Sequence, residues 1–146
     1  MRGMKKYLAS TVLSAALLFT CAANAMQIPQ FDKMDHNDRS KYVTLLVEGA
    51  AKGLTDHGQT DQARKLINLF KDSSDKGGGY QFAKHLQIAR DLNKQTDPKQ
   101  PPYEVENALE VTLKDNGITV PVSFLLALGK DFKPSSPPSE KTKQTR

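Results

Sequence analysis

Residues 42–54 read YVTLLVEGAAKGL, and their apolar side chains recur three and four positions apart. This spacing places the apolar side chains along one side of an α-helix, with the polar ones opposite. Asp35 and Asp38, which are residue types favoured at helix N-caps, precede the segment, and Gly58 follows it as a C-terminal stop. The pattern predicts a helix over residues 38–55.

The same periodicity continues along the chain. It predicts helices over residues 61–72 and 80–93, and another that begins near Pro102 and ends at the Asn-Gly pair 116–117. Residues 121–128 are almost wholly apolar, which is typical of a helix buried on all sides, so we expect this segment to plug the bundle. Alternating strand patterns never exceed three or four residues. The predicted fold is an all-α bundle of four to five helices.

Segments rich in helix-breaking residues separate the predicted helices. Residues 26–33 contain Pro29 and read as a short irregular lead, residues 73–79 as a loop, and residues 94–102, with three prolines, as a linker. Residues 58–63 resemble the turn between the paired helices of a tetratricopeptide repeat, but no second copy follows at a period of about 34 residues. We interpret this turn as an antiparallel helical hairpin and assign no family.

The first 25 residues have the three parts of a cleaved secretory signal. A basic start is followed by a short apolar run and by an A-x-A site at residues 23–25. Cleavage after Ala25 would make Met26 the first residue of a periplasmic or secreted protein. A lipid anchor on Cys21 is the alternative, although Phe19 and Thr20 fit a lipoprotein signal poorly.

The predicted organisation is therefore a signal peptide over residues 1–25, a helical domain over residues 26–133 and a disordered polar tail over residues 134–146. The tail contains prolines, serines and charges but no apolar residue, so it has nothing to bury. Downstream of the signal, no apolar run approaches the ~20 residues that a transmembrane helix needs. The mature chain is expected to carry no membrane span.

Charge and cysteine content exclude several classes of function. The formal net charge of +5 includes three basic residues of the signal, so the mature chain holds 18 basic and 16 acidic residues. A nucleic-acid-binding domain usually carries a basic stripe, and this balanced composition argues against that class. The only cysteine, Cys21, lies in the signal, which removes disulfides, thiolate nucleophiles and cysteine-bound zinc from the mature protein.

Candidate metal and phosphate sites are weak. Residues 72–77 match the start of an EF-hand loop at Asp72 and Gly77, but Lys76 and Ala83 stand where calcium ligands belong. The three glycines at 77–79 lack the rest of a Walker motif and read as a connector. We expect no bound metal and no cofactor.

Candidate catalytic residues do not form a recognisable set either. His36, His57 and His85 show neither helical pair spacing nor an H-E-x-x-H motif. Glu104 and Glu106 are interpreted as solvated carboxylates that favour the start of a helix. No catalytic residue is assigned, and an enzyme whose site forms only in the fold stays open as a less favoured possibility.

The sequence therefore favours a small exported protein–protein interaction module of the cell envelope or secreted space, with an unidentified protein partner. Gly49 and Gly53 form a G-x-x-x-G pattern, which can let one helix approach another chain or a neighbour in the same fold. The alternative is a carrier that holds a small apolar ligand between its helices.

Overall fold

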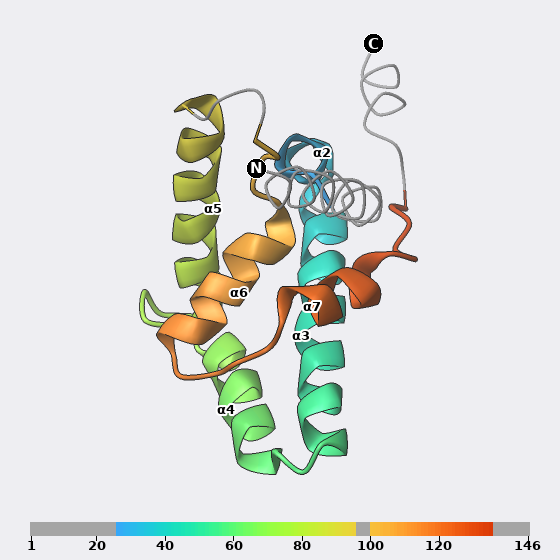
Figure 1. Cartoon of the computed structure of the whole chain (residues 1–146), viewed down its shortest axis with the longest axis vertical. Helices are drawn as coiled ribbons and strands as arrows, with labels where there is room; N and C mark the ends of the chain where they lie inside the picture. Colours follow the sequence, from blue (N-terminus) through green and yellow to red (C-terminus); the bar gives the residue numbers. More distant parts are fainter. Residues whose placement is uncertain (1–25, 96–99, 136–146) are drawn as a thin grey trace, which may run out of the picture.

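A computed structural model describes residues 26–95 and 100–135, and within these residues the chain is all-α (Figure 1). The predicted signal peptide and residues 136–146 of the predicted tail lie outside the described residues. Five helices correspond to those predicted, and one short helix is additional. The bounds are α2 Ile28–Lys33, α3 His36–Asp56, α4 Thr60–Lys71, α5 Gly78–Gln95, α6 Val105–Asp115 and α7 Val122–Gly129.

The two long helices, α3 and α5, stand on opposite sides of the molecule in Figure 1. Helix α4 packs on α3 after a short turn, which confirms the predicted hairpin, and α6 packs along α5. Helix α7 contacts both α3 and α6. None of the described helices combines the length and apolarity required to cross a membrane.

Local chemistry accounts for several helix ends. The Asp35 carboxylate caps α3 by accepting a hydrogen bond of 2.8 Å from Asp38 N. Gly58 and Gly117 have positive φ angles of 78° and 76°, which confirms both as helix stops. Asn107 Oδ1 accepts from Glu104 N at 2.8 Å, so α6 begins after Glu104 and the prediction of a start at Pro102 was wrong.

The predicted irregular lead over residues 26–33 is also wrong, because α2 forms there. Pro29 lies in its first turn, where its missing N–H costs no hydrogen bond. Helix α2 is held by the core: Phe31 makes edge-to-face contacts with Tyr42 of α3 and Phe82 of α5, at centroid distances of 6.4 and 6.2 Å. A six-residue helix gains its stability from such packing rather than from its own turns.

Helix α7 is not the buried plug that its composition predicts. Only Leu125 and Gly129 of this helix are buried, and Ser123 and Ala127 are exposed. Helix α7 contributes only Leu125 to the hydrophobic core, with Phe124 and Leu128 partly buried against it, so α7 lies across α3 and α6 and covers them with one side.

Candidate functional site

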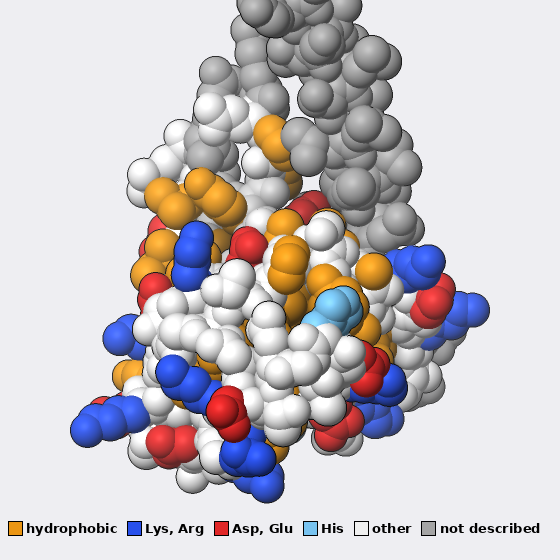
Figure 2. Space-filling view, turned by 60° about the horizontal axis from the view of Figure 1, so that its bottom comes forward, with side chains coloured by type: hydrophobic (Ala, Val, Ile, Leu, Met, Phe, Trp, Pro, Cys, Tyr) orange, Lys and Arg blue, Asp and Glu red, His pale blue; other side chains and the backbone are white. Residues whose placement is uncertain are grey.

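Four large hydrophobic side chains gather at the surface between α5 and α6. Ile88 is 52% exposed, Leu92 40%, Tyr103 45% and Val111 43%, and all four line one shallow groove of about 320 Å³. We call this surface the α5–α6 strip. Figure 2 turns the lower end of Figure 1 forward and shows hydrophobic side chains at the surface on the side where α5 lies.

The helix spacing explains why the α5–α6 strip is open. Ala89 and Ala108 are buried between the two helices, and their small side chains let the backbones approach closely. Ile88 and Leu92 lie one turn apart on α5, beside this contact line, where none of the other described helices covers them. Asn107 and Glu110 supply polar groups at the border, so the strip has the apolar centre and polar rim of a protein interface.

A second, larger groove of about 540 Å³ runs between α3 and α5, with α2 and α4 at its ends. Its floor consists of side chains that belong to the core, including Phe31, Val47 and Phe82. Arg39 and Glu48 lie on its rim. We call it the α3–α5 groove, and its volume falls in the range of about 300–1,000 Å³ that is typical of small-molecule sites.

The Gly49/Gly53 face of α3 is packed against α7 within the fold. A Cβ on Gly49 would lie 2.5 Å from Leu128 Cδ2, and one on Gly53 would lie 2.6 Å from Phe124 Cζ. Both glycines therefore admit side chains of α7, which packs on α3. Of the two interpretations of the G-x-x-x-G pattern, close packing within the fold is confirmed, and contact with another chain through this face stays a prediction.

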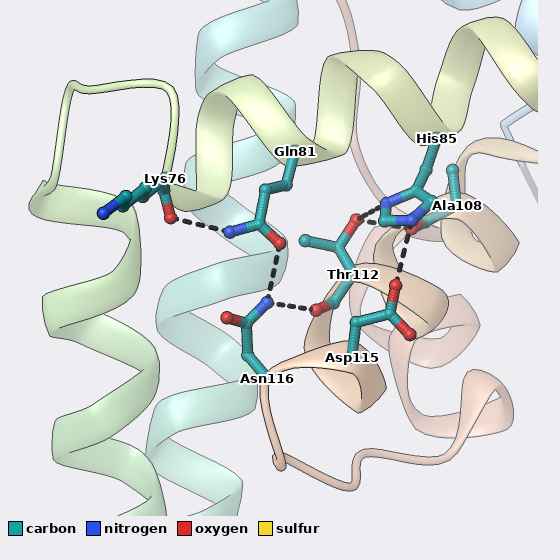
Figure 3. Close-up of polar contacts among 7 residues, drawn as sticks. All are labelled: Lys76, Gln81, His85, Ala108, Thr112, Asp115 and Asn116. Carbon is teal, nitrogen blue, oxygen red and sulfur yellow. Dashed lines mark hydrogen bonds and ion pairs between the residues drawn. The ribbon is translucent and has the colours of Figure 1, made fainter.

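The fold brings His85, Thr112 and Asp115 together between α5 and α6 (Figure 3). His85 Nδ1 lies 2.8 Å from Thr112 Oγ1, and His85 Nε2 lies 3.2 Å from Asp115 Oδ2. A hydroxyl, an imidazole and a carboxylate in this order bear a superficial likeness to a nucleophilic triad. The sequence spacing did not predict this convergence.

The hydrogen bonds of this cluster show a structural role. Thr112 Oγ1 donates its only proton to Ala108 O at 2.9 Å, so it accepts from the imidazole instead of donating to it. Thr112 is also fully buried, where a substrate could not reach its oxygen. A neighbouring bond, from Asn116 Nδ2 to Gln81 Oε1 at 2.9 Å, joins the same two helices.

The remaining sequence candidates are separated in space. His36 lies on the rim of the α3–α5 groove, whereas His57 ends α3, with Nδ1 2.8 Å from Gly53 O. Asp72 Oδ1 accepts from Ser74 N at 2.9 Å, and the hydrogen bonds from Ser74 lower the Asp72 pKa. Within the described part of the chain, no three histidine, aspartate or glutamate side chains are grouped as metal ligands would be.

Glu106 differs most from its predicted place, because it is fully buried rather than solvated. The Tyr42 hydroxyl donates to Glu106 Oε2, and Met26 N donates to Oε1 at 3.3 Å. Burial raises the pKa of Glu106, and the hydrogen bonds from Tyr42 and from backbone N–H groups oppose that rise. Burial and the nearby Glu106 charge also raise the Tyr42 pKa. We call these three residues the Glu106 cluster.

A signal for this burial is present in the sequence. Leu109 and Leu113 follow Glu106 at three and seven positions, which places the carboxylate on the apolar side of α6. Glu104, by contrast, is half-buried at the helix start and accepts from Gln27 Nε2 at 3.0 Å. The two carboxylates, predicted to behave alike, thus have different environments.

No protein family model, curated protein or solved structure matches this chain. The function is therefore inferred from its two apolar surfaces and its buried polar groups.

Proposed function

We propose that this protein is a small exported interaction module of the cell envelope or secreted space, and that it binds a protein partner through the α5–α6 strip. One observation carries this proposal. Among the described residues, four of the six exposed large hydrophobic side chains line a single groove. Scattered apolar residues are normal on a protein surface, but a contiguous group bordered by polar residues is typical of a binding site.

The shape of the α5–α6 strip favours an amphipathic helix of the partner. Ile88 and Leu92 form a ridge on one side of the crevice, and Val111 lies on the other side. A third helix laid along the crevice could insert residues at i and i+4 between them, as in helix-in-groove recognition. Four half-exposed side chains provide less than the ~800 Å² per partner of a stable interface, so the strip would form its hydrophobic centre.

The test is capture of the partner by the processed protein, crosslinked in its own envelope fraction and identified by mass spectrometry. Ile88→Asp and Val111→Asp should each lose the stoichiometric partner. Leu45→Asp is the matched control, because Leu45 is also exposed (37%) but lies on α3. Binding to the purified partner should weaken at least tenfold for the two strip variants and stay within twofold for Leu45→Asp.

Two results would contradict the proposal. Equal binding by Ile88→Asp and Leu45→Asp would exclude the α5–α6 strip as the docking surface. Light scattering of the purified protein that shows a dimer, broken by Ile88→Asp, would assign the strip to a second copy of this chain instead.

The α3–α5 groove supports a second candidate function, carriage of a small apolar ligand. Its apolar floor and polar rim are the features of a ligand site. Native mass spectrometry of the exported protein should then detect a bound small molecule. Ala83→Phe, which places a ring in the groove, should abolish it, whereas Ala127→Phe on α7 should not. Retention of the ligand by Ala83→Phe would exclude this groove.

A further inference from the structure

We infer that Glu106 is a built-in acceptor for the α-ammonium group that processing between Ala25 and Met26 creates. The cluster would thus be a modification-dependent site whose ligand is the protein's own new N-terminus. This inference rests on the export proposed above, because signal removal after Ala25 is what turns the Met26 amide into an amine.

The contacts of residues 26 and 27 hold the Met26 nitrogen at the carboxylate. Met26 N lies 3.3 Å from Glu106 Oε1, and Met26 O accepts from Val105 N at 3.1 Å. Gln27 Nε2 donates to Glu104 Oε2 at 3.0 Å. Met26 and Gln27, the first two residues of the predicted mature chain, are therefore both hydrogen-bonded to the first turn of α6, and Met26 is buried.

Among the described residues, no cationic side chain pairs with the Glu106 carboxylate. Across residues 26–95 and 100–135, none of the ion pairs involves Glu106. The titratable groups that face it are Tyr42 from α3 and Glu104 from the start of α6, and neither supplies positive charge. A buried carboxylate with only neutral donors is costly, whereas one that is paired and hydrogen-bonded is not.

Processing would supply that cation by a simple hydrolysis. Water adds across the Ala25–Met26 peptide bond: its hydroxyl goes to the Ala25 carbonyl carbon, and a proton goes to the Met26 nitrogen. The resulting amine, with an ordinary pKa of about 7.7–8.0, takes one more proton at neutral pH. One neutral donor thereby becomes a positively charged group with three donors, at the position that the fold already holds against Glu106.

The test begins with the complete precursor. The protein is recovered from the exported fraction, and intact mass identifies its first residue. The Met26 α-amino group is then titrated by NMR after labelling with ¹⁵N-methionine, in the folded protein and in urea. We expect the folded pKa to lie at least one unit above the value in urea, which is a tenfold preference of the folded state for the ammonium form.

The dependence of folding stability on pH gives a second readout. Because the folded pKa of the amine is raised, its stabilising contribution is present below its unfolded pKa and is lost as the pH rises through the folded pKa. The urea concentration at the midpoint of unfolding should therefore decrease as the pH is raised from about 7.7 to about 10. Glu106→Gln should remove both the pKa shift and this fall, while Glu110→Gln, one turn further along α6, should leave both unchanged.

The possible failures are distinct. A processed chain that begins at a residue other than Met26 would overturn the cleavage site and this inference together. A chain that begins at Met26, with an amine of equal pKa in the folded protein and in urea, would overturn the pairing alone. The wild-type titration decides this even if Glu106→Gln does not fold. Partner capture through the α5–α6 strip tests the interaction role separately.

Discussion

The α-carbon of Gly77 lies against the backbone carbonyl of Asp72, so closely that a Cβ at residue 77 would overlap the carbonyl oxygen. Asp72 ends α4, and Gly77 directly precedes α5. The three consecutive glycines are thus not one uniform connector. Gly77 closes a tight turn, Gly78 lies against the Phe70 ring in the first turn of α5, and Gly79 faces open space.

This arrangement predicts opposite effects for two neighbouring substitutions. Gly77→Ala should lower the free energy of unfolding by about 1–3 kcal/mol, because the clash is with backbone that cannot move without displacing the end of α4. Gly79→Ala should leave the free energy of unfolding unchanged or raise it by up to about 1 kcal/mol, because alanine has a higher helix propensity than glycine. Urea unfolding measures both. Equal effects of the two substitutions would contradict the close approach at Gly77.

Removing the Tyr42 hydroxyl should destabilise the unprocessed chain, in which Glu106 faces the Met26 amide and not an ammonium group, in a pH-dependent way. Its hydrogen bond lowers the Glu106 pKa, so Tyr42→Phe raises that pKa further above the ordinary value of 4.5. A carboxyl that binds its proton more tightly in the folded state makes stability fall as the pH rises through that window. We expect a loss of about 1–3 kcal/mol at pH 7 and a smaller loss at pH 4.

The Glu106→Gln background supplies the control for this prediction. Without a titrating group at residue 106, the effect of Tyr42→Phe should be the same at pH 4 and pH 7. The measurement is urea unfolding across this pH range for the single and double variants. A pH-dependent effect that persists in the double variant would place its origin outside the Glu106 cluster.

Arg90 joins α5 to α2 through a two-pronged ion pair. Its Nη2 and Nε lie 2.6 and 2.8 Å from the two carboxylate oxygens of Asp32. Arg90→Ala should cost at most about 1 kcal/mol at low salt, and less in 1 M salt, because both side chains are partly solvated. Arg90→Lys should restore only part of the loss, since lysine lacks the planar fork.

The matched control is Arg64→Ala, which breaks a single-pronged pair with Asp61 within α4. The Arg64 side chain is 66% exposed, against 30% for Arg90, so its loss should be smaller. Urea unfolding at two salt concentrations compares the two variants. If the Arg64 variant lost as much stability as the Arg90 variant, the two-pronged geometry would have no special effect.

Helical periodicity was sufficient to predict five of the described helices and the hairpin of α3 and α4. It could not predict which apolar surface would be covered, because coverage depends on helices distant in the sequence. Residues 121–128 are apolar enough for a buried helix, yet only one side of α7 packs against the other helices, and Leu125 is its one hydrophobic side chain in the core. Ile88 and Leu92 extend the apolar stripe of α5, but only the fold shows that the other described residues leave both side chains exposed.

Polar groups were predicted least well, for a related reason. Glu106 lies near a helix start, where a solvated carboxylate is favoured, and that preference does not distinguish it from a carboxylate on the apolar side of α6. The contact of His85 with Thr112 joins residues 27 positions apart, and no local spacing encodes it. Short-range patterns thus predicted the helices, while the candidate sites depend on packing between them.

The packing of α7 on α3 gives a final prediction, in which the effect of one substitution on the free energy of unfolding changes sign. Phe124 Cζ occupies the space that a Cβ on Gly53 would need, so Gly53→Ala should displace the ring and lower the free energy of unfolding by about 1 kcal/mol. In a Phe124→Ala background the clash disappears. Gly53→Ala should then raise the free energy of unfolding by about 0.5–1 kcal/mol, through helix propensity alone.

A double-mutant cycle measured by urea unfolding gives the coupling between the two positions, which should exceed 0.5 kcal/mol for residues in direct contact. Gly58→Ala does not test the same contact, because Gly58 has a positive φ angle and open space around it. It should destabilise the protein equally in both backgrounds. Additive effects of Gly53→Ala and Phe124→Ala would mean that α7 does not pack on the glycine face of α3.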